Sequence, residues 1–267
     1  MLHYSVSGCP GKPVLVFLHG VSNSNLWWAT LTRQLEDDFH VFALDSLGHG
    51  QSRRFESTEL SDPFGASVAA AAEAVDYIHH ITDQSAVLVG HSMGGAIATV
   101  LGAKHPELVR GLLLADPAWL SAAQRRAYAD GVTAALERTD RWATDPATAI
   151  VDNSTLRSEW SKQEQIGWVW GQANVDLNLI ATGIVSFSDE WTDLVSQLRV
   201  PARIITSDGP DCLVRQSGID KLVALGNPLL SGRLLPGGTH SIVPEFLPEF
   251  LSELKEFVAK APFSLEA

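Results

Sequence analysis

The sequence is short of several residue types, and each shortage excludes a class of protein. Only Cys9 and Cys212 supply thiols, too few and too far apart for a disulfide framework or a thiolate metal site. No uninterrupted apolar run approaches the roughly 20 residues that cross a bilayer. Residues 1–4 lack the basic start of a secretion signal. These absences predict a cytoplasmic protein without a metal ion or other cofactor.

Positive charge is also scarce. The chain has 19 lysine and arginine residues against 31 aspartate and glutamate residues, which gives a formal net charge of −12. A negative protein is repelled by nucleic acid and by anionic membranes, so neither is an expected partner. With 267 residues, 45% of them hydrophobic, the chain can bury one large core. We expect a monomer or homodimer that acts on a small molecule.

What the sequence does contain is an alternation of short apolar runs and helical patterns. This rhythm is typical of an α/β fold, a mostly parallel central sheet with helices on both faces. The predicted strands are residues 14–18, 41–44, 86–89, 111–115, 202–206 and 233–235. The predicted helices of this part are residues 26–35, 64–81, 96–104 and 246–260.

The alternation stops between residues 118 and 197, where helical patterns dominate and six tryptophans occur. We therefore predict a core of residues 1–117 and 198–267, with residues 118–197 inserted as a helical cap over the carboxyl edge of the sheet. We expect two or three of the tryptophans to line an apolar pocket, with 168–170 the foremost candidates. Because the cap has few cationic residues, a neutral, fairly hydrophobic substrate is favoured.

Ser92 lies at the centre of Gly90-His91-Ser92-Met93-Gly94, directly after an apolar run and before a stretch of small residues. This order predicts strand, sharp turn and helix, with the serine at the apex. A turn this tight needs glycine neighbours, because a Cβ would collide across it. The pattern indicates a nucleophile whose hydroxyl is lifted clear of the sheet.

A serine hydroxyl needs a base to remove its proton. Among nine histidines, His240 is the best candidate, because it follows the last predicted strand on a glycine-rich loop at the same sheet edge as Ser92. His19, His49 and His91 lie within tight turns, where a local hydrogen-bonding role is expected for each.

Two backbone N–H groups are candidates to bind the oxyanion of a carbonyl under attack. Met93 places its N–H at the start of a helix, aimed at developing negative charge. Val21 follows His19-Gly20 at the end of the first predicted strand and offers an N–H on the opposite side. Each such donor typically contributes about 3–4 kcal/mol of transition-state stabilisation.

With these features, the chain resembles the α/β-hydrolase superfamily. The resemblance rests on four motifs in family order: His19-Gly20, the segment 45–52 (DSLGHGQS), the segment 90–95 (GHSMGG) and the Gly-Gly-Thr-His240 loop. It covers about residues 1–117 and 198–260 and leaves the cap unmatched. It implies Ser92 as nucleophile, His240 as base, and Val21 and Met93 as oxyanion donors.

A carboxylate must hold the tautomer of His240 and stabilise its charged form. The resemblance implies an acid in the turn after strand 202–206, but Asp208 comes slightly early for the usual register and Asp211 one residue late. Some relatives carry their acid at the end of the preceding predicted strand, where this chain has Asp116. Asp116 is favoured, and Asp208 and Asp211 remain open.

These features predict a cofactor-free serine hydrolase that cleaves a carboxylic ester or lactone through an acyl-enzyme. A carbon–carbon bond hydrolase and a cofactor-free haloperoxidase or perhydrolase would use the same triad and remain alternatives. A ligand sensor built on a hydrolase scaffold is the alternative from a different functional class.

Overall fold

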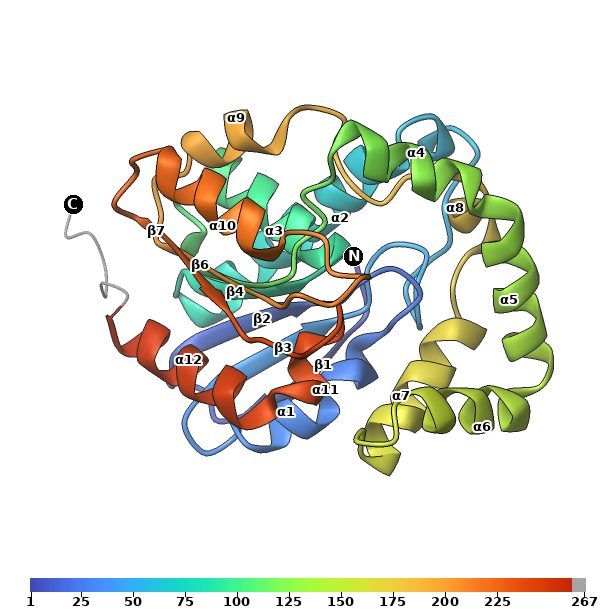
Figure 1. The fold of residues 1–267 in the computed structure, drawn as a ribbon. Coiled ribbons are helices and arrows are strands. Elements are labelled where there is room, and N and C mark those ends of the chain that lie inside the picture. The colour runs from blue at the N-terminus through green and yellow to red at the C-terminus, as the bar shows by residue number, and fades with distance from the viewer. Residues whose placement is uncertain (261–267) are drawn as a thin grey trace.

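The computed structural model describes residues 1–260 and has a seven-stranded sheet at its centre (Figure 1). The strand order is β1-β3-β2-β4-β5-β6-β7, and every neighbouring pair is parallel except β1 with β3. The strands are β1 (Tyr4–Gly8), β2 (Val14–Leu18), β3 (His40–Leu44), β4 (Ala86–His91), β5 (Val109–Ala115), β6 (Ala202–Thr206) and β7 (Leu230–Leu234). The predicted fold class is confirmed.

Helices cover both faces of the sheet (Figure 1). One face carries α2 (Pro63–Thr82), α3 (Met93–Lys104), α9 (Trp191–Ser196) and α10 (Arg215–Ala224). The other carries the 3₁₀ helix η1 (Asn25–Trp28), α1 (Ala29–Arg33), α11 (Ile242–Glu245) and α12 (Leu247–Lys260). A second 3₁₀ helix, η2 (Glu59–Ser61), precedes α2.

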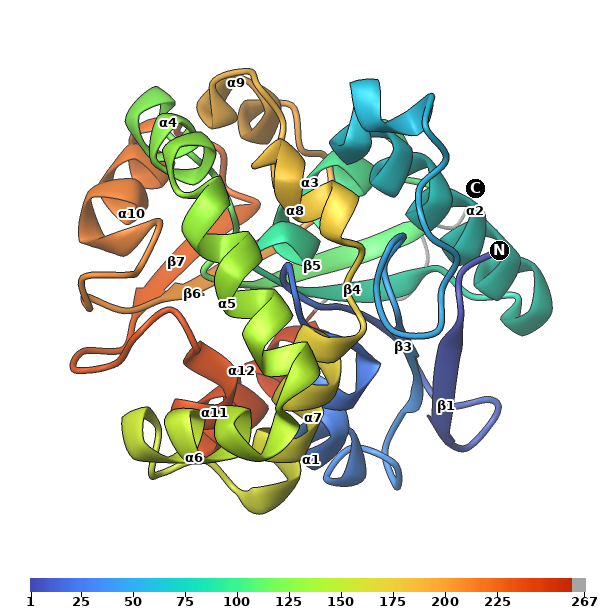
Figure 2. The ribbon, with the colours of Figure 1, turned by 90° about the vertical axis from the view of Figure 1, so that its right-hand side faces the viewer.

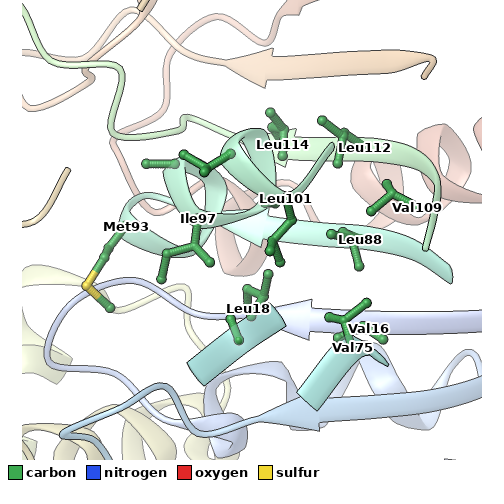
Figure 3. Close-up of a cluster of buried hydrophobic side chains, with 14 of the residues drawn as sticks. Val16, Leu18, Val75, Leu88, Met93, Ile97, Leu101, Val109, Leu112 and Leu114 are labelled. Carbon is green, nitrogen blue, oxygen red and sulfur yellow. The ribbon is translucent and has the colours of Figure 1, made fainter. Parts of the chain in front are cut away.

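The side-chain alternation of β2 divides the core into two clusters. Val16 and Leu18 pack towards α2 and α3, whereas Leu15 and Phe17 pack towards η1, α1 and α12. All five residues of β2 are buried, as expected for a central strand covered on both sides. Figure 3 shows the first cluster, in which Ile97 and Leu101 of α3 lie against the strands. This packing sets α3 firmly behind the turn that carries Ser92.

Five helices lie in front of the carboxyl ends of the strands, where Figure 2 looks onto them. They are α4 (Ala122–Asp130), α5 (Val132–Thr144), α6 (Pro146–Leu156), α7 (Lys162–Ala173) and α8 (Leu177–Thr182). The last helix of the segment predicted as cap, α9, packs against α3 instead, and its Trp191 stacks on Trp119 in the core with ring centroids 4.8 Å apart.

Candidate active site

Ser92 occupies a one-residue turn between β4 and α3, with φ 52° and ψ −119°. A non-glycine residue rarely adopts this backbone conformation, and it turns the chain sharply. The neighbouring glycines leave no room for a side chain: a Cβ on Gly90 would lie 2.7 Å from the carbonyl oxygen of Gly94, and one on Gly94 only 2.1 Å from that of Leu18. The predicted strand–turn–helix geometry is therefore present around Ser92.

His240 and Asp116 meet at the same edge of the sheet. Nδ1 of His240 lies 2.5 Å from Oδ2 of Asp116. The carboxylate is fully buried and also accepts hydrogen bonds from the Thr206 hydroxyl and from the backbone N–H groups of Leu213 and Val214, at 2.7, 2.8 and 3.0 Å.

The hydrogen bonds decide the charge of Asp116. Burial alone would raise its pKa, but the contacts from His240, Leu213 and Thr206 outweigh burial and hold the pKa below the ordinary value of 3.8. The carboxylate is therefore ionised at neutral pH and accepts the Nδ1 proton of the imidazole. This leaves the lone pair on Nε2 of His240 free to accept a proton.

The other two acid candidates bind the backbone of the His240 loop. Oδ1 of Asp208 accepts a hydrogen bond from the Gly237 N–H at 2.8 Å, and Oδ1 of Asp211 accepts one from the His240 N–H at 3.1 Å. Of the three candidates, only Asp116 contacts the imidazole.

The segments of Ser92 and His240 are joined through His91. Nε2 of His91 lies 2.9 Å from the carbonyl oxygen of His240, and the two imidazole rings have centroids 4.7 Å apart. Within residues 1–260 the Ser92 hydroxyl makes no hydrogen bond, to His240 or to any other group. The structure thus brings the two predicted residues into adjacent positions without a direct hydrogen bond between them.

The predicted oxyanion donors lie on two sides of Ser92. Met93 is the first residue of α3, where an N–H has no partner within its helix. The Val21 N–H makes no hydrogen bond in the described part of the chain. Its loop abuts the serine, since a Cβ on Gly20 would lie 3.0 Å from Cβ of Ser92. Both N–H groups are therefore available to a ligand.

Two further side chains, those of His49 and Gln172, hold the Val21 loop in place. Ser22, with φ 61°, donates its N–H to Nε2 of His49 at 3.2 Å and accepts a hydrogen bond at its carbonyl from Nε2 of Gln172 in α7 at 3.0 Å. The sequence indicated a local role for His49, and its turn position was the signal. Gln172 carries no such signal, because only the folded chain brings α7 to this loop.

The buried histidines of these turns are neutral. Burial lowers the pKa of His49 to about 3, and a backbone contact to Leu47 only partly opposes this. Burial likewise lowers the pKa of His91 to about 3, and the nearby His240 lowers it further. At neutral pH both imidazoles therefore act as one donor and one acceptor.

A cavity of about 540 Å³ lies between α4, α5 and α8 of the insertion and the loops that carry Val21 and Leu213. Its lining is mainly apolar and includes Val21, Tyr128, Ala135, Leu179, Val185 and Leu213. No described tryptophan lines this cavity, whereas Trp119 and Trp191 line a second pocket and Trp160 a third. Trp168 instead packs inside the insertion with Trp142 and Trp160, and Trp170 is exposed on α7.

No group of three or more histidine, cysteine, aspartate or glutamate side chains in residues 1–260 could hold a metal ion. In the same range, no helix is both long and apolar enough to span a bilayer.

Residues 13–245 match the family model described as the alpha/beta hydrolase fold. The chain belongs to the alpha/beta hydrolase family. The match includes the turn of Ser92, the buried Asp116 and the loop of His240. The family establishes the fold and the order of these residues along the chain, whereas it does not by itself define an activity or a substrate.

Named relatives of this alpha/beta hydrolase have different substrates. The chain is 26% identical to an (E)-2-((N-methylformamido)methylene)succinate hydrolase of Acinetobacter baylyi, over 78% of this chain and 76% of the relative. It is 32% identical to lipase LipV of Mycobacterium tuberculosis, over 58% of this chain and 54% of the relative. The chain spans only 30% to 54% of the length of the first curated relatives that it matches.

The alpha/beta hydrolase fold also matches solved structures along its whole length. The structure of an E-2-(acetamidomethylene)succinate hydrolase superposes with a TM-score of 0.76 and covers 97% of this chain and 95% of its own. The sequence identity is 19%, so this similarity concerns the fold.

Proposed function

We propose that this alpha/beta hydrolase cleaves a carboxylic ester or lactone of a neutral, fairly hydrophobic substrate through an acyl-enzyme. One observation supports this proposal above all others. The imidazole of His240 is paired at 2.5 Å with the buried carboxylate of Asp116, next to the turn that carries Ser92. A serine, a histidine and an ionised aspartate at one sheet edge can perform nucleophilic catalysis on a carbonyl.

In the proposed reaction, Nε2 of His240 takes the hydroxyl proton as Ser92 attacks the substrate carbonyl. The resulting oxyanion accepts hydrogen bonds from the N–H groups of Val21 and Met93, and Asp116 stabilises the imidazolium. His240 then protonates the leaving alcohol oxygen, and the carbon–oxygen bond breaks to give the acyl-enzyme. A water molecule, deprotonated by His240, attacks the acyl carbon and releases the acid and the Ser92 hydroxyl.

The cavity next to Val21 supports a substrate with an apolar group. Three charged side chains reach its margin, and two of them already make hydrogen bonds. Arg215 donates to the carbonyl oxygens of Cys212 and Pro210, and Asp211 accepts from the His240 N–H, whereas Arg138 lies over the ring of Trp142. Helices α4 and α5 form the outer wall, which supports a role for the insertion as a cap over the substrate. Apolar area that leaves water in such a cavity contributes about 25 cal/mol per Å² to binding.

The test is labelling with a fluorophosphonate, combined with a panel of p-nitrophenyl esters and lactones. We expect covalent modification at Ser92 and turnover of apolar esters, with both lost in Ser92→Ala. Full ester turnover by Ser92→Ala would exclude the proposed mechanism.

The same panel separates the alternatives. Weak ester turnover with cleavage of a vinylogous diketone would favour a carbon–carbon bond hydrolase, and peroxide-dependent turnover a perhydrolase. Tight binding with labelling but almost no turnover would favour a ligand sensor.

A further inference from the structure

We propose that His91 is a positioning residue that fixes His240 against the turn of Ser92 through a hydrogen bond to the His240 backbone. This inference rests on the proposed function, because it assigns a task only if His240 is the base. His91 is the last residue of β4 and directly precedes Ser92. A bond from its side chain to the His240 loop therefore ties the base to the nucleophile's own strand.

The direction of the hydrogen bond follows from the acceptor. The carbonyl oxygen of His240 can only accept, so Nε2 of His91, 2.9 Å away, must carry the proton. The ring is 4% exposed and uncharged at neutral pH, so Nδ1 carries a lone pair and no proton. Within residues 1–260, that buried Nδ1 has no hydrogen-bond partner.

The unpartnered nitrogen shows that stability alone does not explain a histidine here. The His91 ring stacks on Trp27 with centroids 4.4 Å apart and an interplanar angle of 22°. Its Nδ1 also packs against Gly20, where a Cβ would come within 2.9 Å. A phenyl ring could make both contacts without burying an unsatisfied acceptor, which costs stability. What the imidazole supplies and a phenyl ring lacks is the N–H donor to the His240 carbonyl.

The bond completes a three-point hold on His240. Its N–H donates to Oδ1 of Asp211, its carbonyl accepts from His91, and its imidazole donates to Asp116. Asp116 controls only the rotation and tautomer of the imidazole. His91 and Asp211 control where the backbone of residue 240 lies relative to Ser92. Proton transfer is sensitive to such placement, and a 1 Å displacement can lower a rate about 100-fold.

The test compares His91→Phe, which keeps the stacking ring and removes the donor, with His91→Gln, whose amide can donate again. His40→Phe is the matched control, because His40 is also a buried histidine with an unpartnered Nδ1 but packs on Phe42 within β3, which β2 separates from β4. For His91→Phe we expect kcat on an ester to fall about 100-fold with KM unchanged, and fluorophosphonate labelling of Ser92 to slow in parallel. His91→Gln should have a kcat about tenfold higher than that of His91→Phe, and His40→Phe should have the kcat of the unmodified protein.

A second measurement does not depend on any variant folding. In ¹⁵N-histidine NMR spectra of the unmodified protein, His91 should be the neutral Nε2–H tautomer between about pH 5 and 8. A charged ring or an Nδ1–H tautomer would overturn the inference. So would a folded His91→Phe with the kcat and pH profile of His40→Phe. If Ser92→Ala keeps its activity, the proposed function fails; if only His91→Phe keeps it, the positioning role alone fails.

Discussion

Oδ2 of Asp116 lies 2.5 Å from Nδ1 of His240, although 124 positions separate the two residues in the chain. The contact is possible because the sheet is parallel here: β5, β6 and β7 all end at one edge, with Asp116 directly after β5 and His240 in the loop after β7. Strand β6 lies between β5 and β7 in the sheet, and Thr206 at its end donates its hydroxyl to Asp116.

Replacing Asp116 by asparagine should lower kcat about 10⁴-fold, because an amide no longer selects the Nδ1–H tautomer of His240. Asp208→Asn and Asp211→Asn are the matched controls, since each asparagine keeps an oxygen that can accept from the loop backbone. Steady-state kinetics on one ester would measure kcat of the three variants and show which aspartate supports His240. A loss in Asp211→Asn as large as that in Asp116→Asn would contradict this assignment.

The elements that position the site could be read from the sequence, because their signals are local. Apolar runs flanked by breakers placed β6 at its observed residues, and the glycines around Ser92 predicted the turn. The choice among three aspartates could not be made in this way. Asp116 and Asp211 both lie near His240, one at its side chain and the other at its backbone N–H. Only side-chain geometry separates these two contacts.

The places of the tryptophans could not be predicted from the sequence for a related reason. Their number indicates that much apolar surface must be buried, but it does not indicate which part of the protein each ring packs against. In the folded chain Trp119 and Trp191 pack against the core, and Trp142, Trp160 and Trp168 pack against one another. The cavity wall is instead built from small and aliphatic residues such as Ala135 and Leu179, which have no distinctive pattern in the sequence.

Stability should fall as the pH drops below about 6.5, partly because of His49. An unfolded histidine takes up a proton near 6.5, but the folded His49 does so only near 3. Between these values the unfolded state binds more protons, so the free energy of unfolding decreases as pH falls, by up to ~1.4 kcal/mol per pH unit for each such group. Denaturant titrations from pH 7 to 4 should show a shallower slope in His49→Gln. This slope is that of the free energy of unfolding against pH. His80→Gln, at an exposed position, serves as the control. An unchanged slope in His49→Gln would show that His49 does not cause this pH dependence.

Filling the cavity should change substrate preference without changing the chemistry. Ala135→Phe places a ring in the cavity between α5 and α8. We expect KM for a long-chain p-nitrophenyl ester to rise about tenfold, while KM for the acetate stays the same. Ala143→Phe, at an exposed position of the same helix that does not line the cavity, should leave both unchanged. Equal effects on the two esters would show that the acyl chain binds elsewhere.

A methyl group at Gly171 should damage the site from a distance. A Cβ there would lie 2.7 Å from Cα of Asn23 and from the carbonyl oxygen of Ser22. We expect Gly171→Ala to cost about 1–3 kcal/mol of stability through overpacking and to lower kcat, because the backbone beside Val21 must shift. Thermal unfolding and kinetics measure the two effects. Gly102→Ala is the control, since the three atoms nearest to its Cβ would all belong to the Leu112 side chain, the nearest at 2.9 Å, and none to the backbone.

Helix α7 packs closely on the loop of Ser22, whereas α4 and α5 of the same inserted segment pack less closely on the rest of the protein. Lifting α7 would break the Gln172–Ser22 hydrogen bond and disturb the backbone that presents the Val21 N–H. By contrast, α4 buries none of its residues and α5 only Thr139. If the proposed function holds, we therefore expect substrate and product to pass α4 and α5, while the N–H groups of Val21 and Met93, the proposed oxyanion donors, stay in place.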